Sequence, residues 1–236
     1  MYSNFTPKIG ILCWELSQVT RSIKQLSKMK RHCTNPDSYS YPVIIRRVEG
    51  INAKTVVIRP NENVLNKYIK ESKEMISRGV KAITTSGGFN AIHQKKLADA
   101  VDVPVFTSSL MQIPFVSRML RSDQSVAVIT ARGSSLTNEH MQNAGIGRDI
   151  SLHVFGVEDC REWGKLLNLS KGEMDLEIAE EEIISISMNA IKDHHEIGAF
   201  VLECTDMCPF ADAIKKATIL PVFDFITMTN YVYQAI

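Results

Sequence analysis

Two stretches of similar sequence decide the fold, "VKAITTSGGF" (Val80–Phe89) and "IGAFVLECTDMCPF" (Ile197–Phe210), which begin 117 residues apart. Each starts with an apolar run typical of a buried strand and continues into small and polar residues typical of a turn. The same offset relates Pro104–Phe106 to Pro221–Phe223, both of which read Pro-Val-Phe. A shared offset in separate segments indicates an internal repeat.

Strand-like and helix-like segments alternate along the whole chain, which predicts parallel α/β sheets with right-handed crossovers. The expected strands are Ile9–Trp14, Pro42–Gly50, Val80–Ser86, Val103–Ser108, Ser125–Thr130, Leu152–Glu158, Ile197–Glu203 and Leu220–Phe225. The expected helices are Asn61–Arg78, about Asn90–Ala100 and Glu177–His195.

The repeat predicts two pseudo-symmetric lobes, each a parallel sheet flanked by helices. Ile9–Trp14 falls on Val126–Ala131 at the same offset. We expect residues 1–112 to form the first lobe and 113–224 the second, with a C-terminal helix at about 225–236 packing back on the first. Ligands bind at the carboxyl ends of parallel strands, so a cleft between the lobes is the expected site.

The composition is that of an ordinary globular protein: 236 residues, 44% hydrophobic, with 27 Lys and Arg against 26 Asp and Glu. This balance gives no bulk electrostatic reason to bind nucleic acid or an anionic membrane. The chain has no apolar run of transmembrane length, and Met1–Lys8 does not resemble the start of a signal peptide. We therefore expect a cytoplasmic protein whose five cysteines are free thiols.

A basic segment follows the first strand, "RSIKQLSKMKR" (Arg21–Arg31). The simplest interpretation is a solvated, partly helical face that ends in a loop. The functional alternative is a mobile flap that brings basic residues near an acidic substrate.

Cys204 stands where a strand becomes a helix, and Gly87 holds the corresponding position in the first half of the repeat. A helix N-terminus lowers the pKa of a thiol, so Cys204 is expected to be a nucleophile or a general acid/base. The structural alternative is that Cys204 is a buried cysteine that packs as a small hydrophobic residue.

No metal or cofactor motif is evident. Cys208 lies four residues after Cys204, but the sequence offers no second spaced pair, and the six histidines do not cluster at metal spacing. His194–His195 precedes a strand, at the end away from the expected cleft. We therefore expect neither a metal nor an organic cofactor.

Four segments resemble the aspartate/glutamate racemase family, near its hydantoin racemase branch: Pro104–Pro114, Ile197–Phe210, Leu220–Thr227 and the opening "IGILCWE". This resemblance implies two α/β lobes and catalysis without pyridoxal phosphate or metal. It also implies that two cysteines, one from each lobe, move a proton at the α-carbon of a small carboxylate. The second of these cysteines corresponds to Cys204.

The first family cysteine is missing, because "TTSGGF" places Gly87 where relatives read Thr-Thr-Ser-Cys-Gly-Phe. Glycine cannot carry a proton, so two-thiol racemisation is impossible unless water or another residue substitutes. Three interpretations stay open: an altered isomerase, a one-thiol decarboxylase or lyase similar to arylmalonate decarboxylase, and a binding protein without turnover. Asp206 also departs from the Asn of many relatives, and its charge is expected to raise the pKa of a neighbouring thiol.

The main expectation is an isomerase acting on a small carboxylate, with Cys204 as the remaining acid/base and Gly87 at the vacated position. A homodimer is expected from base rates. The residues expected to contact the carboxylate or enolate lie at strand ends and helix starts: Ser86, Gly88, Phe89, Thr130, Ser134, Ser135 and Thr205.

Overall fold

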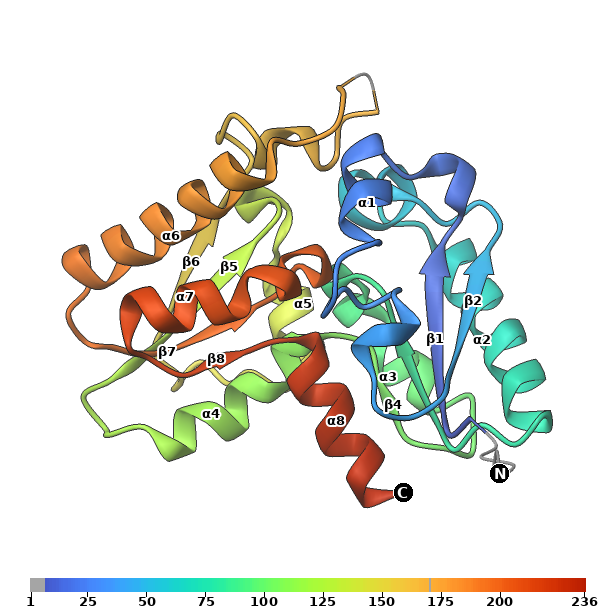
Figure 1. Cartoon of the computed structure of the whole chain (residues 1–236). Coiled ribbons are helices and arrows are strands. Elements are labelled where there is room, and N and C mark those ends of the chain that lie inside the picture. The colour runs from blue at the N-terminus through green and yellow to red at the C-terminus, as the bar shows by residue number, and fades with distance from the viewer. Residues whose placement is uncertain (1–6, 170) are drawn as a thin grey trace.

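The computed structural model describes residues 7–169 and 171–236, and its strands form two separate four-stranded sheets (Figure 1). Every strand pairing in both sheets is parallel. The first sheet has the order β2-β1-β3-β4 and the second the order β6-β5-β7-β8. The strands are β1 (Ile9–Trp14), β2 (Val43–Val48), β3 (Ala82–Thr85), β4 (Val105–Phe106), β5 (Ser125–Thr130), β6 (Leu152–Gly156), β7 (Ile197–Leu202) and β8 (Val222–Phe223).

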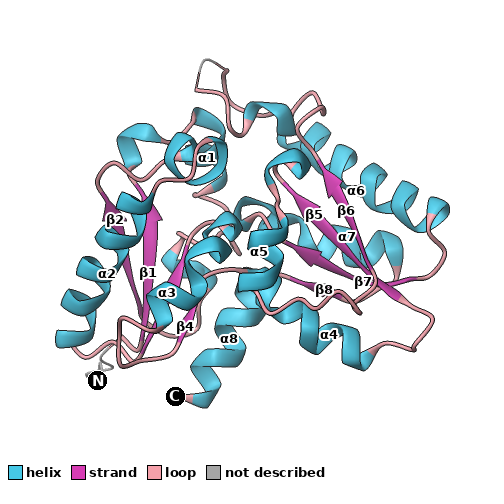
Figure 2. Ribbon diagram, turned by 180° about the vertical axis from the view of Figure 1, so that it is seen from behind, coloured by secondary structure: helices cyan, strands magenta, loops and turns pink. Residues whose placement is uncertain are grey.

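Helices flank both sheets, and Figure 2 shows them from the opposite side. The α-helices are α1 (Arg21–Leu26), α2 (Glu62–Ser77), α3 (Gln94–Ala98), α4 (Ile113–Met119), α5 (Asn138–Asn143), α6 (Leu176–Asp193), α7 (Ala211–Thr218) and α8 (Phe225–Ala235). Shorter helical turns are the 3-10 helices η1 (Leu16–Gln18), η2 (Pro36–Ser38), η4 (Gly88–His93), η5 (Ser109–Gln112), η6 (Gly133–Ser135), η7 (Trp163–Lys165) and η8 (Thr205–Phe210), and the π-helix η3 (Lys54–Ile58).

The two-lobe fold predicted from the repeat is confirmed. The two sheets have the same strand order, and the bounds of η4 and η8, like those of β4 and β8, differ by the predicted offset. One expected element differs, because the segment after β3 starts as the tight 3-10 helix η4 and becomes α-helical only at Gln94. The first residue of η4, Gly88, packs against Glu203 at the carboxyl end of β7, where the two lobes meet. The backbone of η4 therefore has to stay close to the ends of β3 and β7.

The two lobes meet closely at the carboxyl ends of β3 and β7. A Cβ atom at Gly88 would lie 2.3 Å from both the backbone oxygen and the Oε1 atom of Glu203. Next to this contact, the buried Ser109 hydroxyl donates a 2.6 Å hydrogen bond to the backbone oxygen of Leu202. The contact therefore requires the absence of a side chain at position 88.

Helix α8 packs against the first sheet. Phe225 and Ile226 share a buried cluster with Ile9 and Ile11 of β1. Near the C-terminus, Tyr233 stacks on Tyr41 with ring centroids 3.5 Å apart. In Figure 1 this helix descends from the region between the lobes along the first lobe.

The basic segment bridges the lobes. Gln25 of α1 exchanges two hydrogen bonds with the backbone of Met174, at 3.0 and 2.9 Å. The Thr20 hydroxyl donates to the backbone oxygen of Leu166 at 2.9 Å. Arg31 forms a 2.6 Å ion pair with the buried Asp224. Arg31 is thus held by a partner within the protein.

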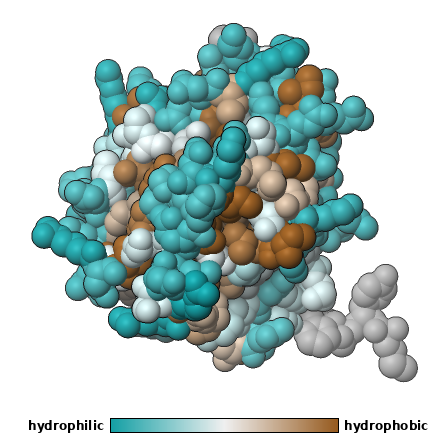
Figure 3. All heavy atoms as spheres, turned by 90° about the vertical axis from the view of Figure 1, so that its left-hand side faces the viewer, coloured by the Kyte–Doolittle hydropathy of each residue, from teal (hydrophilic) through white to brown (hydrophobic). Residues whose placement is uncertain are grey.

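The outer face of the second lobe is mixed in character. Figure 3 shows patches of hydrophobic side chains between hydrophilic ones over this face. Exposed apolar residues of this lobe include Met188 and Ile219. No helix within residues 7–169 and 171–236 is long and apolar enough to cross a membrane. The expectation about an export signal in Met1–Lys8 falls mainly on residues 1–6, outside the described residues.

The lobe contact predicts a stability difference between two glycine substitutions. Gly88→Ala should lower the free energy of unfolding by on the order of 3 kcal/mol, because its Cβ collides with Glu203. Gly172→Ala is the matched control, since nothing lies within 4 Å of its Cβ position. Urea unfolding of the two variants and the parent protein measures the difference. Equal stabilities would show that the lobes do not approach each other at Gly88.

Candidate active site

A pocket that we call the inter-lobe pocket lies between the lobes at the carboxyl ends of their strands. A second cavity, which shares Trp14 and Ala131 with it and extends to Lys54, Arg132 and Glu158, adjoins it. Gly87 and Cys204 both line it, as the repeat predicts. The residues that matter below are contributed by the first lobe (Trp14, Arg47, 86–89), the segment after α1 (32–34) and the second lobe (Ala131, 203–206).

Cys204 is nearly buried, with 7% of its surface exposed. Its thiol lies 3.7 Å from Oδ2 of Asp206 and donates a hydrogen bond to it. Burial raises the pKa of Cys204 well above its usual value, and the negative charges of Asp206 and Glu203 raise it further. The backbone N–H of Asp206 opposes this shift without overcoming it.

The expectation of a depressed thiol pKa at Cys204 is therefore wrong. The helix that follows is η8, a six-residue 3-10 turn, so few aligned peptide dipoles act on the sulfur. Burial and two carboxyl groups outweigh them. The thiol of the free protein carries its proton at neutral pH, and the predicted effect of Asp206 on its pKa is confirmed.

Asp206 also joins Cys204 to His32. The second carboxylate oxygen, Oδ1, lies 2.8 Å from Nε2 of His32. The backbone N–H of Thr34 donates to Nδ1 of His32 at 3.1 Å, so in neutral His32 the proton lies on Nε2 and is donated to Asp206. Thiol, carboxylate and imidazole thus form a continuous hydrogen-bonded chain with one end in the pocket.

Glu203 is a fully buried carboxyl group at the pocket wall. Burial raises its pKa to about 7, while a 2.7 Å hydrogen bond from the Thr130 hydroxyl to Oε2 opposes the shift. Its Oε1 atom has no hydrogen-bond partner among the described residues. Glu203 is therefore a group at the pocket that can gain or lose a proton near neutral pH, whereas Cys204 keeps its proton there.

Gly87 adopts a backbone conformation that favours glycine, with φ at +158°. A Cβ atom there would lie 3.3 Å from Nε1 of Trp14 and 3.4 Å from Nδ2 of Asn90. Both nitrogens belong to buried side chains. In the described part of the chain the Trp14 nitrogen has no hydrogen-bond partner, and the Asn90 amide interacts only loosely with the Tyr68 hydroxyl. Two N–H donors thus face the position that a cysteine side chain would occupy.

The structure brings four of the seven expected contact residues into the pocket, namely Ser86, Gly88, Phe89 and Thr205. The other three do not line it, and that expectation is corrected. Thr130 is turned toward Glu203. Ser134 and Ser135 belong to the turn η6, in which Glu158 accepts from the backbone N–H of Gly133 and Ser134.

Sequence reasoning missed several groups of the pocket. Glu203 adjoins Cys204 in sequence. A carboxyl group at the end of a buried strand was the sequence signal that could have identified it as a site residue. Arg47 and His32 come from a strand end and a loop with no motif, so only the fold brings them to the cysteine. Arg47 forms no ion pair within residues 7–169 and 171–236, and its Nη1 donates to the backbone oxygen of Trp14 at 3.4 Å.

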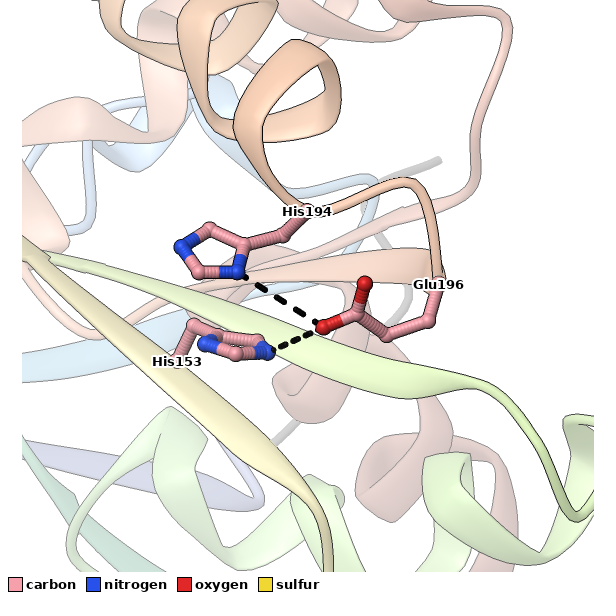
Figure 4. Close-up of side chains that lie close together, drawn as sticks. All are labelled: His153, His194 and Glu196. Carbon is pink, nitrogen blue, oxygen red and sulfur yellow. Dashed lines mark hydrogen bonds and ion pairs between the residues drawn. The ribbon is translucent and has the colours of Figure 1, made fainter.

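The histidines cluster more than the sequence suggests. His153 of β6 and His194 at the end of α6 stack with ring centroids 3.9 Å apart, and both approach Oε1 of Glu196, at 2.7 and 3.6 Å (Figure 4). The three ligand atoms lie within 4.8 Å of one another, an arrangement that suits a transition-metal ion with nitrogen and oxygen ligands. The cluster sits at the amino end of β7, away from the inter-lobe pocket, and its side chains already satisfy one another.

Similarity searches found sequence relatives of one kind. The chain is 29% identical over 203 residues to a dimethylsulfoniopropionate lyase of Durusdinium sp. clade D, covering 84% of this chain and 67% of that protein. It is also 29% identical over 205 residues to dimethylsulfoniopropionate lyase 3 of Emiliania huxleyi, covering 83% of this chain and 53% of the relative. The chain thus spans about half to two thirds of these relatives. No protein-family model matches it.

Solved structures share the fold over almost the whole chain. An allantoin racemase from Pseudomonas fluorescens superposes with a TM-score of 0.60 at 15% identity, covering 96% of this chain and 89% of that one. Unliganded arylmalonate decarboxylase superposes with a TM-score of 0.54 at 12% identity, covering 97% and 92%. The chain therefore has the two-lobed fold that amino-acid and allantoin racemases share with arylmalonate decarboxylase, as the sequence resemblance implied.

The raised pKa of Glu203 predicts how stability depends on pH. The folded protein keeps this proton up to about pH 7, whereas the unfolded chain loses it near 4.5, so the stabilisation is complete below 4.5 and is lost as pH rises through 7. Glu203→Gln, which cannot ionise, should gain on the order of 3 kcal/mol relative to the parent between pH 4.5 and 8. Chemical denaturation across this range measures the gain. The exposed Glu180→Gln is the control, and an equally flat difference for both variants would refute the shifted titration of Glu203.

Proposed function

We propose that the chain is a one-thiol lyase that removes a sulfonium leaving group from the β-carbon of a small carboxylate. The observation that carries this proposal is the thiol of Cys204, which shares with Gly87 a pocket that has a cation on one wall and carboxyl groups on the other. The second thiol of the pocket lining, Cys33, is 1% exposed and comes from the loop after α1 rather than from a strand end. The names of the sequence relatives support it and suggest 3-(dimethylsulfonio)propionate as the substrate to test.

The charges of the inter-lobe pocket suit a zwitterion. Arg47 on the first lobe is a guanidinium group without an ion-pair partner in the described chain, and it can receive a substrate carboxylate. Asp206 on the second lobe offers a negative charge beside Cys204 and can receive the sulfonium cation. A substrate bound in this way spans the two lobes, with its α-carbon near the thiol.

The elimination needs one base. Cys204 passes its proton toward Asp206 and His32, and the thiolate removes the α-proton of the substrate. The electrons of that C–H bond form the double bond, the β-carbon–sulfur bond breaks, and its electron pair leaves with the neutral sulfide. The products are dimethyl sulfide and acrylate. Cys204 now holds the α-proton and is again a thiol, and the proton that it had passed to Asp206 and His32 is released to solvent.

A raised pKa makes the thiolate of Cys204 harder to form, and binding of the cationic substrate should lower that pKa. The charge of Asp206 is one of the causes of that shift, and a sulfonium cation beside it offsets the repulsion that a thiolate would meet. Formation of the Cys204 thiolate is therefore favoured when a substrate with a cationic leaving group is bound.

Racemisation is less well supported, because it needs a second proton carrier on the opposite face, where Gly87 has no side chain. Decarboxylation is the second candidate. It is favoured by the raised pKa of Cys204, since a thiol that holds its proton can deliver it to the carbanion formed when carbon dioxide leaves.

The role of Cys204 is tested by assaying the purified chain with 3-(dimethylsulfonio)propionate. Cys204→Ser should lower the rate of dimethyl sulfide release at least about a hundredfold, because the general base is lost. Cys160→Ser, which alters a cysteine outside the pocket, should retain the parent rate. Headspace gas chromatography measures the sulfide, and chromatography of the solution measures acrylate.

Two outcomes would contradict the lyase proposal. Carbon dioxide release from arylmalonates without sulfide release from the sulfonium substrate would establish the decarboxylase. Racemisation of amino acids in deuterated water, again without release of dimethyl sulfide, would show that the chain is an isomerase.

The pH profile tests whether the thiolate is the base. Asp206→Asn removes a negative charge that raises the pKa of Cys204, so the rising limb of kcat/KM for elimination should move to lower pH. The maximal rate should fall as well, since the variant binds the sulfonium less strongly. Steady-state rates over the alkaline range, from about pH 8 up to the limit at which the protein stays folded, measure the limb above the titration of Glu203. An unchanged limb would exclude Cys204 as the titrating base.

A further inference from the structure

We propose that Trp14 and Asn90 form a carboxylate-binding subsite over Gly87, which holds one oxygen of the substrate carboxylate opposite Cys204. This inference deepens the proposed function and rests on it for the identity of the substrate. The subsite exists only because position 87 has no side chain.

The first observation is a pair of buried donors that lack a well-formed hydrogen bond. Asn90 is fully buried in η4, and neither atom of its amide group has a partner at full hydrogen-bond geometry among the described residues, although the amide interacts with the nearby Tyr68 hydroxyl. The indole N–H of Trp14, which is 8% exposed, has no hydrogen-bond partner among these residues. The other tryptophan is different, because Nε1 of Trp163 donates to the backbone oxygen of Ala179 at 2.8 Å.

The second observation is that the two nitrogens converge on one place. They lie 3.3 and 3.4 Å from the position of a Cβ atom at Gly87. An oxygen atom there needs to move only a few tenths of an ångström to accept both N–H groups at about 2.9 Å. Trp14 and Gly87 both line the inter-lobe pocket, so a ligand in the pocket can reach this place.

The third observation concerns the sign of the charge. Arg47 lines the same side of the pocket, and its guanidinium donates to the backbone of Trp14. This wall therefore presents N–H donors and a positive charge, whereas Cys204, Glu203 and Asp206 lie on the other lobe. Such a wall selects an anionic oxygen, and the same donors can stabilise the charge that develops on the carboxylate when the α-proton leaves.

The arrangement costs stability in the free protein. A buried amide without a hydrogen bond is destabilising, and replacing it by an apolar group of similar shape is neutral or stabilising. A donor retained for binding should therefore give opposite effects on stability and on affinity when it is replaced. A purely structural asparagine would not behave in this way.

The experiment measures binding of acrylate, a carboxylate that cannot undergo the elimination, by isothermal titration calorimetry. Trp14→Phe and Asn90→Leu should each weaken acrylate binding at least about tenfold, the effect of losing a hydrogen bond to a charged group. Asn90→Leu should also keep or raise the melting temperature. Trp163→Phe is the matched control, since it removes an indole N–H that is already satisfied, and it should leave acrylate affinity unchanged.

Unchanged acrylate affinity in both Trp14→Phe and Asn90→Leu, with both variants folded, would overturn the subsite. It would not affect the proposed function if the same variants still released dimethyl sulfide. Conversely, weakened acrylate binding in a protein that eliminates no sulfonium substrate would support the subsite and overturn the lyase proposal.

Discussion

The close approach of Gly88 to Glu203 is the constraint on which the site depends. Because a Cβ atom at position 88 would collide with Glu203, the two strand ends can meet only through a glycine. Their meeting removes Glu203 from water and raises its pKa to about 7. The same burial, together with the carboxyl groups on either side, keeps the thiol of Cys204 protonated. Packing between the lobes thus sets the chemistry of the pocket.

The fold could be predicted from the sequence because its evidence is local and repeated. Apolar runs such as Ile9–Trp14 and Ser125–Thr130 coincide with strands, and the repeat offset brings Gly87 and Cys204 to one pocket. The electrostatics could not be predicted in the same way. A helix N-terminus suggests a lowered thiol pKa, whereas the opposing burial results from contacts with the other lobe, far away in sequence.

The individual contact residues were predictable only in part, for a related reason. A polar residue after a strand has several possible partners, and its neighbours in the fold decide among them. Thr130 lies at the end of a strand, as expected of a contact residue, but its hydroxyl donates to Glu203. The turn that contains Ser134 donates its backbone N–H to Glu158 instead of lining the inter-lobe pocket. His32 reaches Asp206 from a loop without a motif, so nothing in its local sequence marks it.

The absence of a side chain at Gly87 has a chemical consequence. A cysteine side chain there would begin 3.3 to 3.4 Å from the nitrogens of Trp14 and Asn90, and so would cover the two donors that surround the position of Gly87. A second proton carrier and an oxygen-binding pair therefore compete for the same volume. Racemisation needs the carrier, because a proton must arrive on the opposite face. Elimination needs none, because the electrons of the broken C–H bond form the double bond while the electron pair of the carbon–sulfur bond leaves with the sulfide. It also benefits from donors that hold the carboxylate. On this argument the loss of one cysteine changes which reaction the pocket favours, since the remaining thiol and the uncovered donors together are what an elimination requires.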